Sequence, residues 1–494
     1  RDYSELNYPY IYSIPEICHQ LGVKDGVIAP GSRSAPLTIA FARHSSIQCR
    51  VIPDERSAAF IAMGIAQESD RPVVLICTSG SAALNFYPAI AEAYFQQIPL
   101  LVLTADRPPE WIDQYDGQTI RQHKVYENHV KKSFSLEVDQ NHADAQWFSQ
   151  RIISEAVNLT NEFPKGPCHI NVPFREPLYP TKQHEANIEV KVIQHIRSDP
   201  KLDADQIKLL KSELSSSTKT MVICGQEFYE EQVIHHLNHL SETFKIPVLG
   251  DVISNIHGIE SAVLRSDIFL GSSKKGLHES LKPDLLITFG KSILSKQLKF
   301  MLRKNPPTRH WHIQPSGEVA DTYQGLTQII RTPVRHFLEV LNSLDSKEDF
   351  DFQKQENYYQ IWQIEERKVL RSLSEFFTQK TMGEFEVIYN VLSRLKTGNL
   401  HLANSMAVRY ANFIGLTAIQ SDVKVFCNRG TSGIDGSNST AVGVAIESPS
   451  KLNILVTGDM AFFYDRNAFW HNYQIPNLRI LLLNNHAGCI FRLI

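Results

Sequence analysis

Residues 452–459 read LNILVTGD, and residues 478–487 read LRILLLNNHA. Each is an apolar run of strand length that ends in polar residues, Gly458-Asp459 in the first and Asn484-Asn485 in the second. Runs of this kind are typical of parallel strands that are buried on both faces of a sheet. Because parallel strands end at one common edge, we expect Asp459 and Asn485 to meet where doubly wound folds bind ligands. A carboxylate, an amide oxygen and a backbone carbonyl suit a hard cation such as Mg²⁺ that also holds phosphate oxygens.

Similar apolar runs recur along the chain and alternate with amphipathic stretches. Residues 55–68 form one such stretch, in which alanines supply helix propensity and Ile61 and Ile65 supply an apolar face. Alternating strands and helices predict an α/β fold whose parallel strands are joined by right-handed crossovers. The other predicted strands are Val73–Cys77, Leu100–Thr104, Met221–Cys224 and Leu285–Phe289.

The length of the chain predicts that it contains several domains. The 494 residues are 43% hydrophobic and 21% charged, as in a globular protein, and a chain of this length divides into about three domains. Two polar stretches, 176–187 and 343–355, mark the expected boundaries. We therefore predict three consecutive parallel-sheet α/β domains at residues 1–182, 183–345 and 346–494.

Composition disfavours several classes of function. The formal net charge is −3 and no Lys/Arg block is present, so we expect no nucleic-acid partner. The seven cysteines form no CxxC pair, which favours small buried side chains and the reducing cytoplasm over disulfides or zinc. No apolar run approaches the roughly 20 residues that span a bilayer. The sequence begins at Arg1 rather than Met, so we expect a short segment before it. The spacing of His235, His236 and His239 predicts a solvated helix face rather than a metal site.

The Gly458-Asp459…Asn484-Asn485 pair is similar to the diphosphate-binding motif of the thiamine-diphosphate enzymes. That resemblance implies thiamine diphosphate with Mg²⁺, or Mn²⁺ in its place, and metal ligands at Asp459, Asn485 and the carbonyl of Ala487. Glycine is common at the position of Ala487, but only a backbone oxygen is needed there, so alanine fits if its φ is negative. No FAD fingerprint is present. The other cofactor contacts that the resemblance implies are Glu55, Thr78, Ser79, Gly80, Ser432, Ile434, Met460, Ala461 and Ile490.

Glu55 follows a short apolar run and opens a predicted helix, where a carboxylate is most often a capping residue. The resemblance implies another role, in which Glu55 faces N1′ of the aminopyrimidine and favours the tautomer that takes the proton from the thiazolium ring. For that role we expect Glu55 to be buried, with a raised pKa. The same resemblance places the cofactor between the first domain of one subunit and the last of another, so we expect a homodimer, or a homotetramer built from it.

Narrower strings indicate the substrates. The strings IAPGSRS (28–34), TADRPPE (104–110), QTIRQ (118–122), NSMAVR (404–409) and NRGTSGIDG (428–436) resemble those of the 2-succinyl-5-enolpyruvyl-6-hydroxy-3-cyclohexene-1-carboxylate synthases of menaquinone biosynthesis. That family implies decarboxylation of 2-oxoglutarate and 1,4-addition of the succinyl unit to isochorismate. Both substrates carry two carboxylates, which guanidinium groups bind in a bidentate manner.

The family match also implies which residues touch the substrates. Lys296 matches a basic position, whereas Gln297 stands where arginine is common, and Lys299 could compensate. With Glu55, the residues with expected catalytic roles are Ser32, Arg33 and Gln118. The expected substrate contacts are Ser32, Arg33, Arg107, Gln118, Lys296, Ser405, Arg409, Arg429, Ile490 and Phe491.

Some alternatives stay open at the level of sequence. A different thiamine carboligase, such as an acetolactate-synthase-like enzyme, would share Glu55, Asp459 and Asn485 without the arginines. A cofactor-binding or regulatory protein without turnover is a second alternative, and the intact Glu55, Asp459 and Asn485 argue against it. The apolar side chain that supports the bent cofactor is expected among Ile434, Phe462 and Phe463. Related enzymes extend beyond the position of Ile494, so a C-terminal tail is expected.

Overall fold

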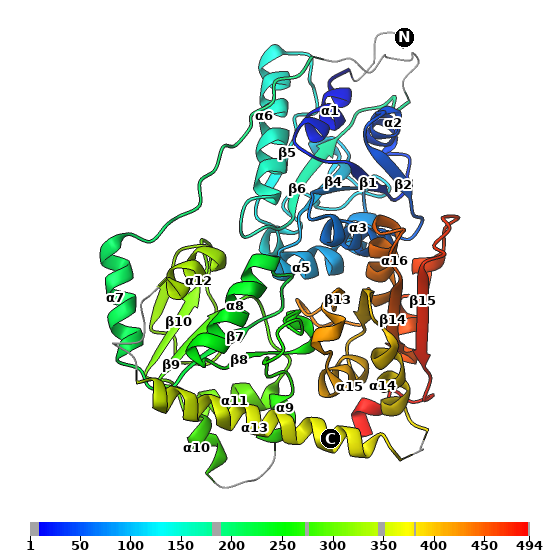
Figure 1. Ribbon diagram of the computed structural model, residues 1–494. Helices are drawn as coiled ribbons and strands as arrows, with labels where there is room; N and C mark the ends of the chain where they lie inside the picture. The colour runs from blue at the N-terminus through cyan, green and yellow to red at the C-terminus, as the bar shows by residue number, and fades with distance from the viewer. Residues whose placement is uncertain (1–8, 180–188, 272–275, 344–350, 380–381, 493–494) are drawn as a thin grey trace. The chain divides into compact units, whose positions relative to one another are not determined.

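Every strand pairing that the structure describes is parallel. The computed structural model describes residues 9–179, 189–271, 276–343, 351–379 and 382–492 (Figure 1). Its contacts divide the chain into two compact units. Unit 1 comprises residues 1–196 and 428–489, and unit 2 comprises residues 197–427 and 490–494. The predicted α/β class with parallel sheets is confirmed. The division into three domains stays a prediction, and most of its first boundary lies outside the described residues.

Unit 1 is built on a six-stranded sheet with the order β2-β1-β3-β4-β6-β5. Helices cover both faces of this sheet (Figure 1). The strands are β1 (Asp25–Ile28), β2 (Gln48–Val51), β3 (Val73–Cys77), β4 (Leu100–Asp106), β5 (Ser133–Ser135) and β6 (Cys168–Pro173). The helices are α1 (Ser13–Gln20), α2 (Ala35–Arg43), α3 (Glu55–Ser69), α4 (Ser81–Asn85), α5 (Tyr87–Gln96) and α6 (Ala143–Thr160).

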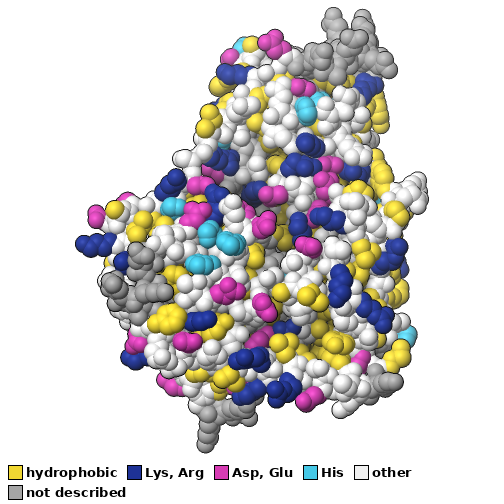
Figure 2. Space-filling model, viewed as in Figure 1, with side chains coloured by type: hydrophobic (Ala, Val, Ile, Leu, Met, Phe, Trp, Pro, Cys, Tyr) yellow, Lys and Arg dark blue, Asp and Glu magenta, His cyan; other side chains and the backbone are white. Residues whose placement is uncertain are grey.

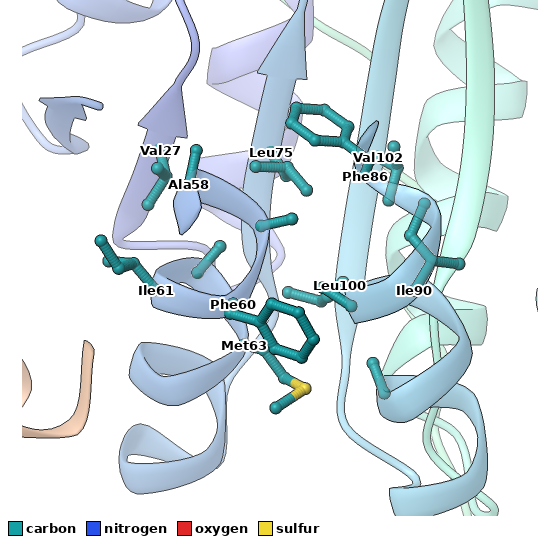
Figure 3. Packing of buried hydrophobic residues seen from close by; sticks show 14 of the residues in the cluster. Val27, Ala58, Phe60, Ile61, Met63, Leu75, Phe86, Ile90, Leu100 and Val102 are labelled. Carbon is teal, nitrogen blue, oxygen red and sulfur yellow. The ribbon is translucent and has the colours of Figure 1, made fainter. Parts of the chain in front are cut away.

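Side chains of the central strands alternate between two apolar layers. Leu75 packs with Phe60 of α3 and Ile90 of α5, on one face of the sheet (Figure 3). Its neighbours Val74 and Ile76 pack with α1, α2 and α6 on the other face. Strands buried on both faces read as continuous apolar runs, which is why the sequence identifies them.

The C-terminal part of unit 1 joins the N-terminal part through two helices. These helices, α3 and α16, pack closely at Gly64 and Gly443, where an added Cβ on either residue would lie within 2.3 Å of a backbone oxygen of the other helix. Beyond α16, β14 pairs with β15 in a register that sets Gly458 opposite Leu483. The elements of this part are α16 (Ser437–Glu447), β14 (Asn453–Gly458), α17 (Asp459–Tyr464), η7 (Arg466–Phe469) and β15 (Leu478–Leu483).

Unit 2 contains a five-stranded sheet with the order β11-β10-β9-β7-β8, and it also contains β12 and β13, which pair with each other in parallel. The strands are β7 (Thr220–Cys224), β8 (Val248–Gly250), β9 (Leu285–Phe289), β10 (Arg309–Ile313), β11 (Gln328–Ile330), β12 (Gly398–Leu402) and β13 (Val423–Phe426). The helices are α7 (Ala204–Ser215), α8 (Glu231–Phe244), α9 (Ser266–Leu270), α10 (Leu277–Leu281), α11 (Lys296–Lys304), α12 (Val334–Asn342), α13 (Phe352–Phe376), α14 (Glu384–Arg394) and α15 (Met406–Ile414). A last short helix, η8, spans Cys489–Arg492.

Several smaller expectations can be compared with the structure. Of the three histidines predicted to form a solvated face of α8, His235 and His239 are exposed and His236 is half-buried. Of the cysteines whose side chains are described, five are buried, and Cys49 is partly buried with its pKa raised to about 11 by burial. Basic and acidic side chains are interspersed on the face drawn in Figure 2. Within the described ranges, no helix is long and apolar enough to cross a membrane.

Candidate active site

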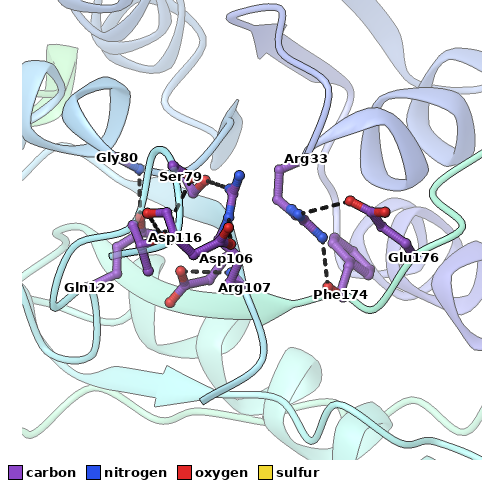
Figure 4. A network of polar contacts seen from close by, with 11 residues as sticks. Arg33, Ser79, Gly80, Asp106, Arg107, Asp116, Gln122, Phe174 and Glu176 are labelled. Atoms are coloured by element: carbon purple, nitrogen blue, oxygen red, sulfur yellow. Dashed lines mark hydrogen bonds and ion pairs between the residues drawn. The ribbon is translucent and has the colours of Figure 1, made fainter. Parts of the chain in front are cut away.

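Four neighbouring strands of unit 1 end at one edge of the sheet, and predicted site residues lie in the turns that follow them. Ser32 and Arg33 follow β1, Glu55 follows β2, residues 78–80 follow β3, and Arg107 follows β4. The strands are parallel, and β2, β1, β3 and β4 lie in this order. These turns therefore share one edge of the sheet. Figure 4 shows Arg33, Ser79, Gly80 and Arg107 in this region.

Glu55 is the first residue of α3, and its neighbours fix the start of that helix. Asp54 is the N-cap and accepts hydrogen bonds from the Ser57 amide and the Asn467 side chain, each at 2.9 Å. Burial opposes ionisation of Asp54, but these hydrogen bonds and Arg56 lower its pKa below the ordinary value. Arg56 also donates to the carbonyl of Tyr464 at 2.6 Å. Asp54 and Arg56, the residues on either side of Glu55 in the sequence, thus hold the backbone at Glu55 in place.

The Glu55 side chain itself takes no part in capping. It is half-buried in the single chain, where the sequence predicted a buried side chain. No described residue hydrogen-bonds or ion-pairs with its carboxylate. An acid with this placement can accept or donate a hydrogen bond to a group bound at the edge of the sheet.

The turn after β3 lies close to the segment that carries Gln118 and Gln122. Gly80 has a φ of 86°, and a Cβ there would lie 3.3 Å from the backbone oxygen of Gln118. The Gly80 amide donates to the side chain of Gln122 at 3.1 Å. The hydroxyl of Thr78 is buried and has no hydrogen-bond partner among the described residues. A buried polar atom in this state is costly, and a bound polar group would satisfy it.

The two arginines at this edge are held in place by polar contacts. Arg107 donates to the Ser79 hydroxyl at 2.6 Å and to Asp116 at 2.8 Å (Figure 4). Arg33 is only 6% exposed and donates to the Phe174 carbonyl at 3.0 Å. Both guanidinium groups are therefore held by contacts within the chain, and each also pairs with a carboxylate, Arg107 with Asp116 and Arg33 with Glu176.

Ser32 and Gln118 are exposed at the same edge. Gln118 has a φ of 56°, a left-handed conformation that costs free energy in a residue other than glycine. Asp106, beside Arg107, is buried, and this burial raises its pKa although Asn171 and Arg107 lower it. Strained backbone and a perturbed acid at one sheet edge are features that functional sites share.

A second edge lies where β14 and β15 end. Asp459 directly follows β14, and Asn485 comes two residues after β15, as the sequence predicted. Asp459 is 7% exposed and accepts a hydrogen bond from the Met460 amide at 2.8 Å. The Ala487 amide donates to the side chain of Asn485 at 3.1 Å. In this turn positive φ angles fall on His486 and Gly488, not on Ala487, so alanine is accommodated without strain.

The Asp459 carboxylate, the Asn485 side chain and the Ala487 carbonyl suit a cation that is also bound by phosphate oxygens. The described residues contain no cluster of three or more His, Cys, Asp or Glu side chains that could hold a metal. One carboxylate, one amide and one carbonyl are too few for a protein-only cage, but they suit Mg²⁺, which is usually held by few protein ligands and substrate phosphates. Met460, exposed, and Ala461, buried, begin α17 beside this turn.

The loop 428–436 carries three predicted site residues. Arg429 and Ile434 are half-buried, and Ser432 is exposed with a φ of 62°. The loop is held by Glu92 of α5, which the sequence analysis did not identify. Of the other apolar side chains considered for cofactor support, Phe462 is half-buried and Phe463 is 59% exposed.

The remaining predicted residues belong to unit 2. Lys296 is exposed at the start of α11, and the Gln297 amide donates to Asp267 at 3.0 Å. Ser405 precedes α15 with a φ of 76°, and Arg409 is exposed on the same helix. Ile490 is half-buried and Phe491 is exposed in η8.

A buried polar cluster behind the first edge was missed in part by the sequence analysis. Asn171 accepts hydrogen bonds from Thr104 at 2.9 Å and Gln122 at 3.0 Å, and it donates to Asp106 at 2.8 Å. Gln122 lay in a quoted string without a role of its own. The alternation of His169 and Asn171 with apolar residues in β6 was the available signal, because buried strand positions rarely carry polar side chains.

Comparison with known families agrees with this arrangement. Residues 13–133 match the family described as "Thiamine pyrophosphate enzyme, N-terminal TPP binding domain". Residues 213–402 match the family described as "Middle domain of thiamine pyrophosphate". The first match includes the edge that carries Glu55 and Thr78.

Three similar proteins carry the same name. The chain is 46% identical over 486 residues to the 2-succinyl-5-enolpyruvyl-6-hydroxy-3-cyclohexene-1-carboxylate synthase of Cytophaga hutchinsonii, a match that covers 98% of this chain and 84% of that protein. The synthase of Flavobacterium johnsoniae is 39% identical, with 99% and 85% covered, and that of Bacteroides fragilis is 40% identical, with 95% and 81% covered. The chain therefore belongs to the 2-succinyl-5-enolpyruvyl-6-hydroxy-3-cyclohexene-1-carboxylate synthase family of thiamine pyrophosphate enzymes.

Proposed function

We propose that this protein catalyses the thiamine-diphosphate- and Mg²⁺-dependent decarboxylation of 2-oxoglutarate and the 1,4-addition of the succinyl unit to isochorismate. The observation that carries the proposal is the pair of sheet edges in unit 1. One edge presents Glu55 and the Thr78–Gly80 turn, and the other presents Asp459 and Asn485. Family membership supports the choice of this reaction over that of an acetolactate-synthase-like enzyme.

Residues of both edges would hold the cofactor. Glu55 would hydrogen-bond the aminopyrimidine, and the buried Thr78 hydroxyl would find its missing partner in the bound group. Asp459, Asn485 and the Ala487 carbonyl would hold Mg²⁺, or Mn²⁺, together with the diphosphate. When bound, thiamine diphosphate supplies the electron sink that makes loss of CO₂ from a 2-oxo acid feasible.

Arginines of the chain would bind the substrate carboxylates. Arg33 and Arg107 are already oriented by the Phe174 carbonyl and the Ser79 hydroxyl, so little side-chain entropy is lost when an anion binds. Guanidinium groups stay charged when water is excluded, which Lys and His do less reliably. The family resemblance assigns further substrate contacts to Ser32, Gln118, Lys296, Ser405, Arg409 and Arg429. Their work is orientation and charge stabilisation.

We also propose that the active species is a homodimer. Phe463, Tyr464 and Trp470 follow Asp459 in the sequence, and each is more than half exposed in the single chain. Exposed aromatic side chains in such number mark association surfaces, because isolated soluble chains rarely leave large apolar patches in water. A second copy would cover them and border the cation site.

The proposal is tested by following the absorbance of isochorismate with 2-oxoglutarate, thiamine diphosphate and Mg²⁺. We expect loss of absorbance only when all components are present. Glu55→Gln should slow turnover by about 10²- to 10⁴-fold, the usual contribution of an acid–base group. Glu68→Gln is the matched control, because Glu68 lies at the far end of the same helix and contacts Lys451. Equal rates in wild type and Glu55→Gln would contradict the role of Glu55.

A further inference from the structure

Glu92 is a fully buried carboxylate on a largely apolar helix. It lies in α5 (Tyr87–Gln96) and is 0% exposed. Its helix neighbours Ala89, Ile90 and Ala93 belong to the apolar core of unit 1. A carboxylate in such surroundings destabilises the fold unless its oxygens are hydrogen-bonded. The groups that bind the Glu92 oxygens therefore explain how it can be buried.

The oxygens of Glu92 are occupied by the loop that precedes α16. The Gly430 amide donates to one oxygen at 2.9 Å, and the Thr431 amide donates to the other. The Thr431 hydroxyl donates to that second oxygen at 2.7 Å. The Gln96 side chain, one turn further along α5, donates to the first at 2.7 Å. Two consecutive backbone amides on one carboxylate fix the course of the main chain, and such charge-assisted bonds are about twice as strong as neutral ones.

Gly430 shows how tightly the loop lies on α5. A Cβ at this position would come within 2.8 Å of the Glu92 carbonyl oxygen and 2.9 Å of its carboxylate. Glycine is therefore required for the two segments to approach each other. Further along the loop, a Cβ at Gly436 would lie 2.3 Å from the Phe60 ring. The loop is thus held at both ends. Near Arg429 it is held by hydrogen bonds to Glu92, and near Gly436 it packs against the Phe60 ring.

We propose that Glu92 is a positioning residue that holds loop 428–436 so that Arg429 can bind a substrate carboxylate. The inference rests on the proposed function, because Arg429 is a substrate contact only if the substrates are anionic. The amides that Glu92 holds belong to the two residues directly after Arg429. A displacement of the main chain at Gly430 therefore moves the base of the arginine side chain. Loss of orientation of about 1 Å can cost 10²-fold in rate.

The role can be separated from simple support of the fold by a double-mutant cycle. Glu92→Gln keeps the size of the side chain but presents an amide group to donors that need an acceptor. We expect it to lower kcat/KM by about 10- to 100-fold in the wild-type background. In an Arg429→Ala background the same change should lower kcat/KM less than threefold, because the group that it positions is already gone. Equal losses in the two backgrounds would overturn the proposal.

Two further variants control for damage to the fold. Gln96→Leu removes a buried polar partner of Glu92 without touching the loop, and we expect nearly unchanged kcat/KM. Thr431→Val removes only the hydroxyl contact, so a loss of a few-fold in kcat/KM is expected even if Glu92→Gln does not fold. A loss in Gln96→Leu as large as that in Glu92→Gln, or an unchanged kcat/KM in Thr431→Val, would mean that Glu92 only supports the helix.

Amide hydrogen exchange tests the inference without any assay of turnover. Glu92→Gln should raise exchange at residues 430–431 by at least tenfold, while the strands of unit 1 keep wild-type protection. If wild type does not turn over the two substrates but this exchange pattern is found, the proposed reaction fails and the anchoring by Glu92 stands. Unchanged exchange at both amides would overturn the anchoring itself.

Discussion

Asp459 is the only carboxylate that the described residues place at the end of β14, and the proposed cation site depends on it. Its side chain is nearly buried and already accepts one backbone hydrogen bond. Removal of this ligand should leave Asn485 and a carbonyl, which are too weak to hold Mg²⁺ alone. The effect should therefore appear in cofactor binding rather than in folding.

We expect Asp459→Ala to weaken binding of thiamine diphosphate by at least about tenfold and to abolish its dependence on Mg²⁺. Titration calorimetry with and without Mg²⁺ measures both effects. Asp422→Ala, at an exposed position of unit 2, is the control and should bind as wild type does. Mg²⁺-dependent binding that survives in Asp459→Ala would place the cation elsewhere.

We expect Asp465 to make the stability of unit 1 depend on pH. Burial raises its pKa to about 7, although the Ser439 amide and hydroxyl and the charge of Arg56 lower it. Between the ordinary value of 3.8 and this value, the folded chain keeps a proton that the unfolded chain has released. The free energy of unfolding should therefore fall as pH rises from about 4 to about 7, by up to about 4 kcal/mol, and then stay level.

Denaturant unfolding of wild type and Asp465→Asn, measured between pH 4.5 and 8, tests this dependence. The asparagine cannot release a proton, so the free energy of unfolding of the variant should decrease much less between pH 4.5 and 7 than that of wild type. The stability of the variant relative to wild type should therefore be highest near pH 8. Parallel curves for the two proteins would show that Asp465 titrates normally.

Single residues differ in how well the sequence predicted them. Thr78 and Asp459 stand directly after apolar runs, and Glu55 follows a shorter one, so the sequence places each of them near the end of a strand. Glu92 and Asn171 could not be placed in this way, because their partners are 338 and 65 residues away in Gly430 and Asp106. Contacts between distant segments depend on tertiary packing, which no local pattern contains.

Secondary elements were predicted better than their packing. The run Val73–Cys77 is β3, and the predicted helix 55–68 is α3 to within one residue. The close pairing of α3 with α16 was not predicted, since Gly64 and Gly443 look like ordinary small residues in the sequence. Their importance lies in the backbone approach that they permit.

Gly64→Ala tests this packing at the scale of the element. The added Cβ would lie 2.3 Å from the carbonyl oxygen of Thr440, and backbone atoms cannot move aside cheaply. We expect a loss of about 1–3 kcal/mol in the free energy of unfolding, although alanine favours the helix more than glycine does. Gly117→Ala, where a Cβ meets no atom within 4 Å, should change stability by less than about 0.5 kcal/mol. A Gly64→Ala protein as stable as wild type would contradict the close approach.

At the scale of the whole molecule, the proposed dimer makes each active site from two chains. Co-expression of Glu55→Gln and Asp459→Ala chains with different tags would then create mixed dimers with one intact site each. Random pairing predicts about a quarter of wild-type activity in the mixture, and about half in purified mixed dimers. Each variant alone should be nearly inactive. Mixed dimers without activity would show that Glu55 and Asp459 of one chain serve the same site.

The coupling of the two substrates is the central claim, and the ratio of CO₂ released to isochorismate consumed tests it most directly. With 2-oxoglutarate labelled at its carboxylate carbon C1, the account predicts one labelled CO₂ per isochorismate lost, and little release when isochorismate is omitted. Release of CO₂ at the same rate with and without isochorismate, or no consumption of isochorismate at all, would contradict it.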